Sequence, residues 1–188
     1  MPALVHVTLG SRQLATQSAA HREGLRVSEI RLTALAAEDV QALVDAQVEP
    51  YPARPSLRRA VAERGRGNPF YAEELVRAFR ERGDLVLADG AYDLREGATE
   101  VVPPSLHALI AARIDRLPPS ARELIADTAV LGKCNPLAHL RALTPGEGFD
   151  EDLAQVERRG LLDAEAGGGI AGLSFHHVLT KEVAYGIY

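Results

Sequence analysis

The chain has 188 residues, of which 46% are hydrophobic and 5% aromatic, with no Trp, one cysteine and a net charge of −5. This length predicts one or two small domains with a real core, and the negative charge excludes a global basic field that would attract nucleic acid. The single Cys134 excludes an internal disulfide, and its simplest role is that of a small packed side chain. No apolar run approaches the roughly 18 residues of a membrane span, and residues 1–9 lack a signal peptide, so we expect a cytoplasmic protein without a membrane partner.

The first residues have the pattern of an α/β domain end. Residues 3–9 form an apolar run typical of a short buried strand, which ends at Gly10-Ser11, and a second strand candidate lies within residues 25–32. Two strands are too few to make a parallel sheet. We therefore expect residues 1–32 to be the last piece of a larger α/β core.

Residues 33–100 are predicted to be mainly helical. Val40, Val44 and their neighbours have helical spacing, and prolines break the chain between residues 50 and 55. Ser56 is expected to cap a second helix that runs to about Arg64. Residues 96–102 are a linker candidate.

The next helix has the clearest start signal. Asn68 is a good N-cap, Pro69 fits the first helical position, and proline favours the extended backbone that a cap residue needs. The helix is expected to stop at Gly83. Two short apolar segments flank Asp89-Gly90, which predicts a β-hairpin.

Residues 101–188 show a compact set of helices followed by a hairpin. Pro-Pro-Ser at 103–105 and at 118–120 start two helices, and further helices are expected at about 136–143 and 150–159. Short strands flank the glycine-rich turn at 167–169, and a last helix begins near Leu179. This order predicts a winged-helix domain.

Five segments together carry a family resemblance. The segment from Gly67 to Leu75 resembles the Gly-Asn-Pro-hydrophobic-x-x-Glu-Glu-Leu motif of the STAND branch of AAA+ ATPases. Residues 102–118 resemble the "VPPSLxALIxARLDRLP" opening of the winged-helix part of these ATPases, and three further matches follow in the family's order: residues 129–132 ("AAVLG"), 159–162 ("RGLL") and 175–185 ("FRHALxREVAY"). A separate match at residues 10–12 is short. The nearest relatives by pattern are ATPase modules of large bacterial regulators, linked to adenylate-cyclase-like domains or to a LuxR-type DNA-binding end.

The resemblance implies a mainly α fold. It places a remnant of an α/β P-loop core at 1–32, a helical lid with a β-hairpin at 33–100 and a winged helix at 101–188. The chain contains no G-x-x-x-x-G-K-[ST] loop and no apolar strand ending in paired acidic residues, both of which the family keeps upstream. The chain then corresponds to the C-terminal half of a switch ATPase, as a fragment, a truncated reading frame or a degenerate relative. ATP or ADP with magnesium is the expected cofactor of the intact parent, whereas this chain alone is expected to have no cofactor and no catalytic activity.

The resemblance also assigns candidate nucleotide-binding residues. Pro69, held by the Asn68 cap, matches the proline that packs on adenine, and Arg12 resembles the arginine near the γ-phosphate. His177 aligns with the histidine that faces the β-phosphate of ADP, while His176 stands where the family has arginine, so which histidine faces the nucleotide stays open. Adjacent residues on a strand point to opposite faces, which argues against both reaching one phosphate and against a metal site. No catalytic or metal-binding residues are predicted.

Two function classes follow. The first is a lid and winged helix that clamp onto their own upstream P-loop core and report whether ATP or ADP is bound. The alternative is a DNA-binding winged-helix transcriptional regulator. Residues 101–188 hold 8 Lys or Arg against 11 Asp or Glu, a net charge of −3, and the helix before the wing is acidic. A DNA reader should present basic side chains to phosphates, so the switch is favoured and no direct DNA binding is expected. Oligomerisation of the parent is left open.

Overall fold

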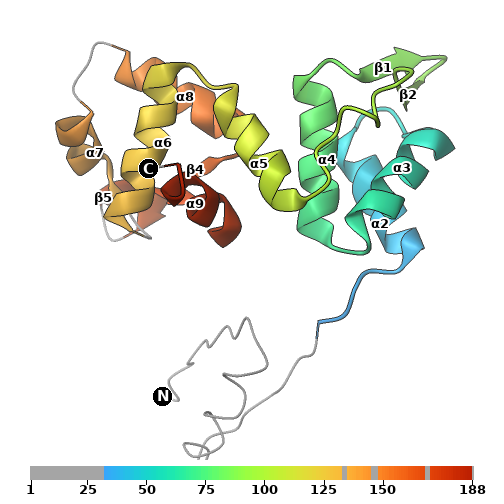
Figure 1. Ribbon diagram of the computed structural model, residues 1–188, viewed down its shortest axis with the longest axis horizontal. Helices are drawn as coiled ribbons and strands as arrows, with labels where there is room; N and C mark the ends of the chain where they lie inside the picture. Colours follow the sequence, from blue (N-terminus) through green and yellow to red (C-terminus); the bar gives the residue numbers. More distant parts are fainter. Residues whose placement is uncertain (1–31, 133–134, 145–147, 168–169, 188) are drawn as a thin grey trace, which may run out of the picture. The chain divides into compact units, whose positions relative to one another are not determined.

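The computed structural model describes residues 32–132, 135–144, 148–167 and 170–187. The chain divides into a segment, Met1–Thr33, and a compact unit, Ala34–Tyr188. Within this unit helices dominate, and two small antiparallel sheets accompany them (Figure 1). The predicted mainly α class is therefore confirmed. The strands expected before residue 32, and Arg12 with them, lie outside the described residues.

The first part of the compact unit, which we call the N-terminal module, contains three helices and a hairpin. These are α2 (Ala37–Gln47), α3 (Pro55–Gly65), α4 (Pro69–Glu81), β1 (Leu85–Ala88) and β2 (Ala91–Leu94). The hairpin turns at Asp89-Gly90 as predicted, because both residues take a positive φ, 49° and 72°. The predicted cap at Ser56 is wrong: Pro55 already opens α3 after Arg54, and the Ser56 hydroxyl instead donates to Asp93 on β2.

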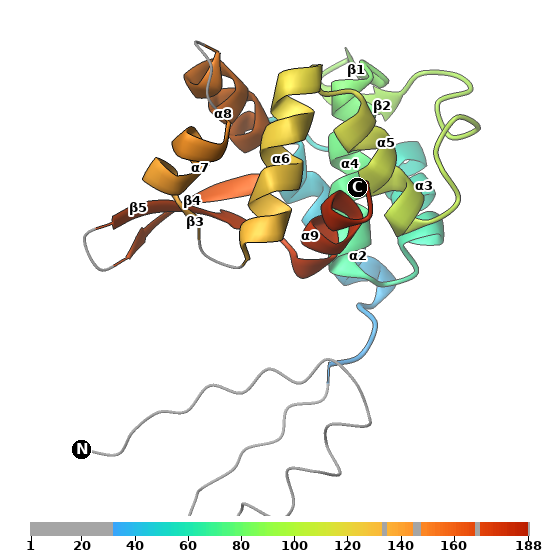
Figure 2. The same ribbon diagram turned by 60° about the vertical axis from the view of Figure 1, so that its left-hand side comes forward.

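The second part, the C-terminal module, contains five helices and a three-stranded sheet. Its helices are α5 (Leu106–Asp115), α6 (Pro119–Leu131), α7 (Leu137–Leu143), α8 (Phe149–Arg158) and α9 (Val178–Tyr185). Strands β4 (Leu162–Gly167) and β5 (Ile170–Phe175) form the hairpin expected from the sequence. A two-residue strand that the sequence analysis missed, β3 (Asn135–Pro136), pairs with the other edge of β5, and α7 contacts both strands (Figure 2).

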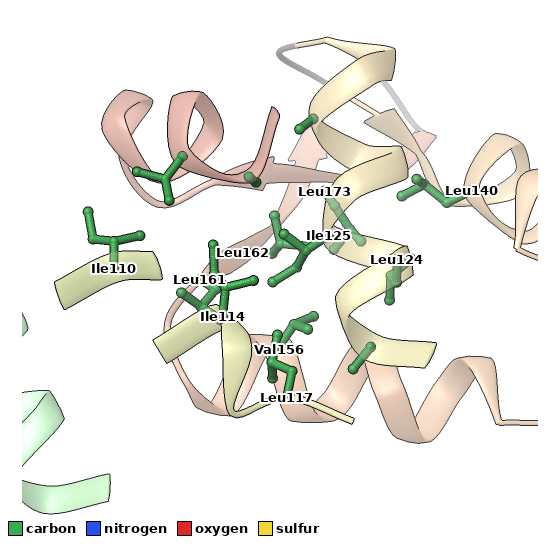
Figure 3. Packing of buried hydrophobic residues seen from close by; sticks show 14 of the residues in the cluster. Ile110, Ile114, Leu117, Leu124, Ile125, Leu140, Val156, Leu161, Leu162 and Leu173 are labelled. Atoms are coloured by element: carbon green, nitrogen blue, oxygen red, sulfur yellow. The ribbon is translucent and has the colours of Figure 1, made fainter. Parts of the chain in front are cut away.

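Each module has its own hydrophobic core. The core of the N-terminal module is built from α2, α3 and α4, with Leu57, Leu75 and Phe79 among its fully buried residues. In the core of the C-terminal module, side chains from α5, α6, α8 and the β4–β5 hairpin converge around Leu124 and Ile125 (Figure 3). Helix α5 belongs to both cores, since Leu109 packs in the first and the next residue, Ile110, in the second.

Candidate functional site

The start of α4 has the predicted geometry. Asn68 has an extended backbone, and its side-chain oxygen accepts a hydrogen bond from the Tyr71 N–H at 3.1 Å. Pro69 occupies the first helical position, where its missing N–H leaves no hydrogen bond unmade. Both Asn68 and Pro69 are exposed, so the face of the proline ring is accessible for a ligand.

The turn before α4 is fixed by close backbone packing. The Leu35 N–H donates to the Gly67 carbonyl at 2.9 Å, and Gly67 has a φ of 74°. A Cβ at this position would lie 2.7 Å from the Leu35 carbonyl oxygen. Only glycine accepts this positive φ and leaves room for the Leu35 backbone beside it. Gly67 therefore allows the segment leading into α2 to pack against the turn that precedes α4.

The two neighbouring histidines point to different partners. His177 is the N-cap of α9, where its Nδ1 accepts from the Leu179 N–H at 3.1 Å. The His177 ring also stacks on Phe70 of α4, with ring centroids 3.8 Å apart and an interplanar angle of 14°. His176 instead lies 2.8 Å from the Asp163 carboxylate on β4. The expectation that both histidines lie on a strand is wrong, because β5 ends at Phe175, and it is the turn into α9 that separates their side chains.

The contacts of His177 determine which ring nitrogen carries the proton. Because Nδ1 accepts the hydrogen bond from Leu179, the neutral ring carries its hydrogen on Nε2. Burial lowers the pKa of His177, and the neighbouring His176 lowers it further, whereas the nearby Glu73, Glu74 and Glu182 act in the opposite direction. His177 is therefore neutral at pH 7, with one N–H on Nε2 available as a hydrogen-bond donor.

The structure thus brings two of the sequence-predicted regions together. The Phe70–His177 stack joins the residue after Pro69 to the first turn of α9. An open hollow of about 510 Å³ adjoins Asn68, but neither Pro69 nor His177 lines it; its walls are formed by Glu63, Arg64, Gly65, Arg66, Asn68, Tyr71 and Pro104. Pro69 is exposed, and His177 is partly buried.

Sequence reasoning missed a buried ionic cluster between α4 and the C-terminal module. Arg113 of α5, which is 1% exposed, is paired with Glu74, which is 2% exposed, and with Glu81 at 2.7 Å. Arg113 also donates to the Arg159 carbonyl, and Arg77 donates to the Gly160 carbonyl at 3.1 Å. One signal was present in the sequence: Arg113 stands at a helix position flanked by the core residues Ile110 and Ile114, where an unpaired charge would be costly.

Two further findings concern metal ligands and membrane-spanning helices among the described residues. Across the described ranges, no three His, Cys, Asp or Glu side chains are grouped so as to hold a metal ion. In the same part of the chain, none of the helices has the length and apolar character that crossing a membrane requires. Comparisons of the sequence with protein-family models and with curated proteins found no match.

Proposed function

We propose that this chain is the lid and winged-helix part of an ATP/ADP-dependent signalling switch in a bacterial regulatory ATPase of the STAND type, either transcriptional or cyclase-linked. In this proposal the N-terminal module is the lid and the C-terminal module is the winged helix. The intact parent supplies the P-loop core, which binds ATP or ADP with magnesium. The chain alone is inactive as an ATPase, because phosphoryl transfer needs phosphate and magnesium contacts that this sequence lacks.

The observation that carries the proposal is the stack of His177 on Phe70. According to the family resemblance, Pro69 and His177 contact the same nucleotide, Pro69 at the adenine and His177 at the β-phosphate. The two residues are 108 positions apart in the sequence. The stack brings His177 into contact with Phe70, the residue next to Pro69. Two residues that contact one nucleotide have to lie this close together. The Nε2–H of His177 is a suitable donor for a phosphate oxygen, and Asn68 with Pro69 provides a rigid, exposed helix start.

The DNA-binding alternative has less support. In a winged helix the helix before the wing enters the major groove, and here that helix is α8. Its first turn carries Asp150, Glu151 and Asp152, which interact favourably with the helix dipole but would repel phosphates. Basic side chains that could offset this charge are few in the C-terminal module, whose sequence has a net charge of −3, from 8 Lys or Arg against 11 Asp or Glu.

The experiment that tests the proposal measures ADP release from the protein together with its upstream P-loop core. If the His177 ring donates to the β-phosphate, His177→Ala removes one hydrogen bond to a charged group, worth about 1.5–3 kcal/mol, and ADP should dissociate roughly 10- to 100-fold faster. His176→Ala is the matched control and should change the off-rate little, because His176 faces Asp163. Equal off-rates for wild type and His177→Ala would show that the ring only packs against Phe70.

A further inference from the structure

One face of α4 contacts the C-terminal module. Phe70, Glu74, Arg77 and Glu81 follow one another at spacings of four, three and four residues, which places them in one stripe along the helix. Their partners are, in order, the His177 ring, Arg113, the Gly160 carbonyl and again Arg113. We call these four residues the coupling face of α4. It therefore reaches α5, the turn between α8 and β4, and the first turn of α9.

The opposite side of α4 has a different chemistry. Ala72, Leu75, Val76 and Phe79 are buried in the core of the N-terminal module with α2 and α3. Helix α4 thus packs in its own core through apolar contacts, and it meets the C-terminal module through charged contacts as well as through Phe70 and through Leu109 of α5. Apolar contacts accept many packings of similar area, whereas buried charges must meet their partners in one arrangement.

Arg113 is the residue on which this arrangement depends. Burial alone would lower its pKa, but the hydrogen bond to Glu81 and the charges of Glu74 and Glu81 raise it, so the guanidinium stays charged. A small separation of the two modules would break the ion pair between Arg113 and Glu74 before water could reach the two charged groups. A buried charge without its partner is strongly unfavourable, so partial separation is disfavoured. Gly160 has a φ of 61°, which favours glycine, and a side chain there would displace the flexible end of Arg77, which donates to the Gly160 carbonyl.

We propose that the coupling face of α4, closed by Arg113, makes the two cores one cooperative unit, so that the N-terminal and C-terminal modules open and unfold together. This inference concerns the chain itself and does not depend on nucleotide binding. It has a consequence that separate cores would not have: damage to one core must lower the stability of the other. The shared helix α5 supports it, since Leu109 and Ile110 belong to different cores.

The test is hydrogen exchange measured by mass spectrometry in increasing urea, with peptides from α3 and α6 reporting on the two modules. In wild type both sets of amides should open at the same urea concentration. Leu124→Ala damages only the core of the C-terminal module, because Leu124 is fully buried there. If the modules are coupled, this variant lowers the midpoint of the α3 peptides together with that of the α6 peptides.

The matched comparison removes the two buried charges, those of Glu74 and Arg113, as a pair. Glu74→Gln with Arg113→Met removes both fully buried charges together, while the side chains of Arg77 and Glu81, which are 21% and 17% exposed, keep contact with solvent. In this background Leu124→Ala should lower the α6 midpoint by about 0.5 M urea or more, and it should shift the α3 midpoint less than it does with the coupling face intact, because α5 still joins the two cores. An unchanged α3 midpoint in Leu124→Ala with the coupling face intact would overturn the inference. That arm needs no substitution at Arg113, so the inference stays testable even if the charge-removed protein does not fold.

Discussion

Replacing His177 tests whether its ring both caps α9 and packs against Phe70. His177→Ala removes the cap on the Leu179 N–H, worth about 1 kcal/mol, and the ring stack, worth about 0.5–1.5 kcal/mol. The expected loss at pH 8 is therefore roughly 1.5–2.5 kcal/mol in the free energy of unfolding. His177→Asn restores a cap without the stack and should lose only about 0.5–1.5 kcal/mol.

The pH dependence of the same variants gives an independent readout. Burial lowers the pKa of His177 below the ordinary value of about 6.5, so the unfolded chain binds this proton more tightly than the folded protein. The stabilisation of the folded protein that depends on the neutral His177 ring is therefore fully present above pH 6.5. It is lost as the pH falls through the lower pKa of the folded protein. Protonation of Nδ1 also removes the acceptor for the Leu179 N–H. Wild type should thus lose more stability than His177→Asn between pH 8 and pH 5.

Urea unfolding followed by circular dichroism at the two pH values measures both effects. Glu73, Glu74 and Glu182, which lie near His177, are present in every variant and so do not distinguish one variant from another. His176→Ala is the control at pH 8, because the exposed contact between His176 and Asp163 contributes at most about 1 kcal/mol. The reasoning is refuted if His177→Asn is as unstable as His177→Ala at pH 8, or if wild type and His177→Asn have parallel pH profiles.

Three further predictions concern the helix start and the proposed function. Asn68→Ala should lower the free energy of unfolding by about 1 kcal/mol, whereas Asn68→Ser, which keeps a capping oxygen, should change it little; equal losses in urea unfolding would contradict the role of the cap. The purified chain should show no ATP turnover above buffer in a steady-state assay, and turnover that survives repeated purification would refute the assignment. Fluorescence anisotropy with random duplex DNA at low salt should show no saturable binding; micromolar affinity that weakens steeply with salt would instead favour the DNA-binding alternative.

The features that could be predicted from the sequence are those decided by local chemistry. Asn68 with Pro69 and Ser105 start helices where expected, because cap and first-turn residues act within three or four positions of themselves. The Asp89-Gly90 turn could also be predicted, because a two-residue hairpin loop of this type needs a positive φ at both residues and Asp-Gly accepts it. Ser56 shows the limit of this reasoning. Pro55 was the stronger start signal, and the Ser56 hydroxyl donates a hydrogen bond to Asp93 on β2 instead of capping the helix.

The features that could not be predicted are pairings between distant segments. Glu74 and Arg113 are 39 positions apart, and nothing in their local sequence states which of the chain's many charges will meet. The two-residue strand β3 is likewise too short to show a periodic pattern, and it is a strand only because it pairs with the edge of β5. His177 combines both situations, since its cap is local and its stack on Phe70 is not. The proposed lid, winged helix and nucleotide contacts remain predictions that the ADP measurement addresses.

The crowded backbone around Gly67 has a consequence for which sequences this fold tolerates. At Gly90 a side chain would meet open space, so residues that accept left-handed backbone, such as Asn or Asp, can replace it at small cost. At Gly67 no such replacement exists, because the obstacle is the main chain of Leu35 rather than a movable side chain. In a library that samples all residues at both positions and selects for folded protein, Gly90 should be recovered with several substitutions and Gly67 almost always as glycine. A glycine next to a helix cap is usually read as a hinge; here it marks a site where two segments of backbone are held together.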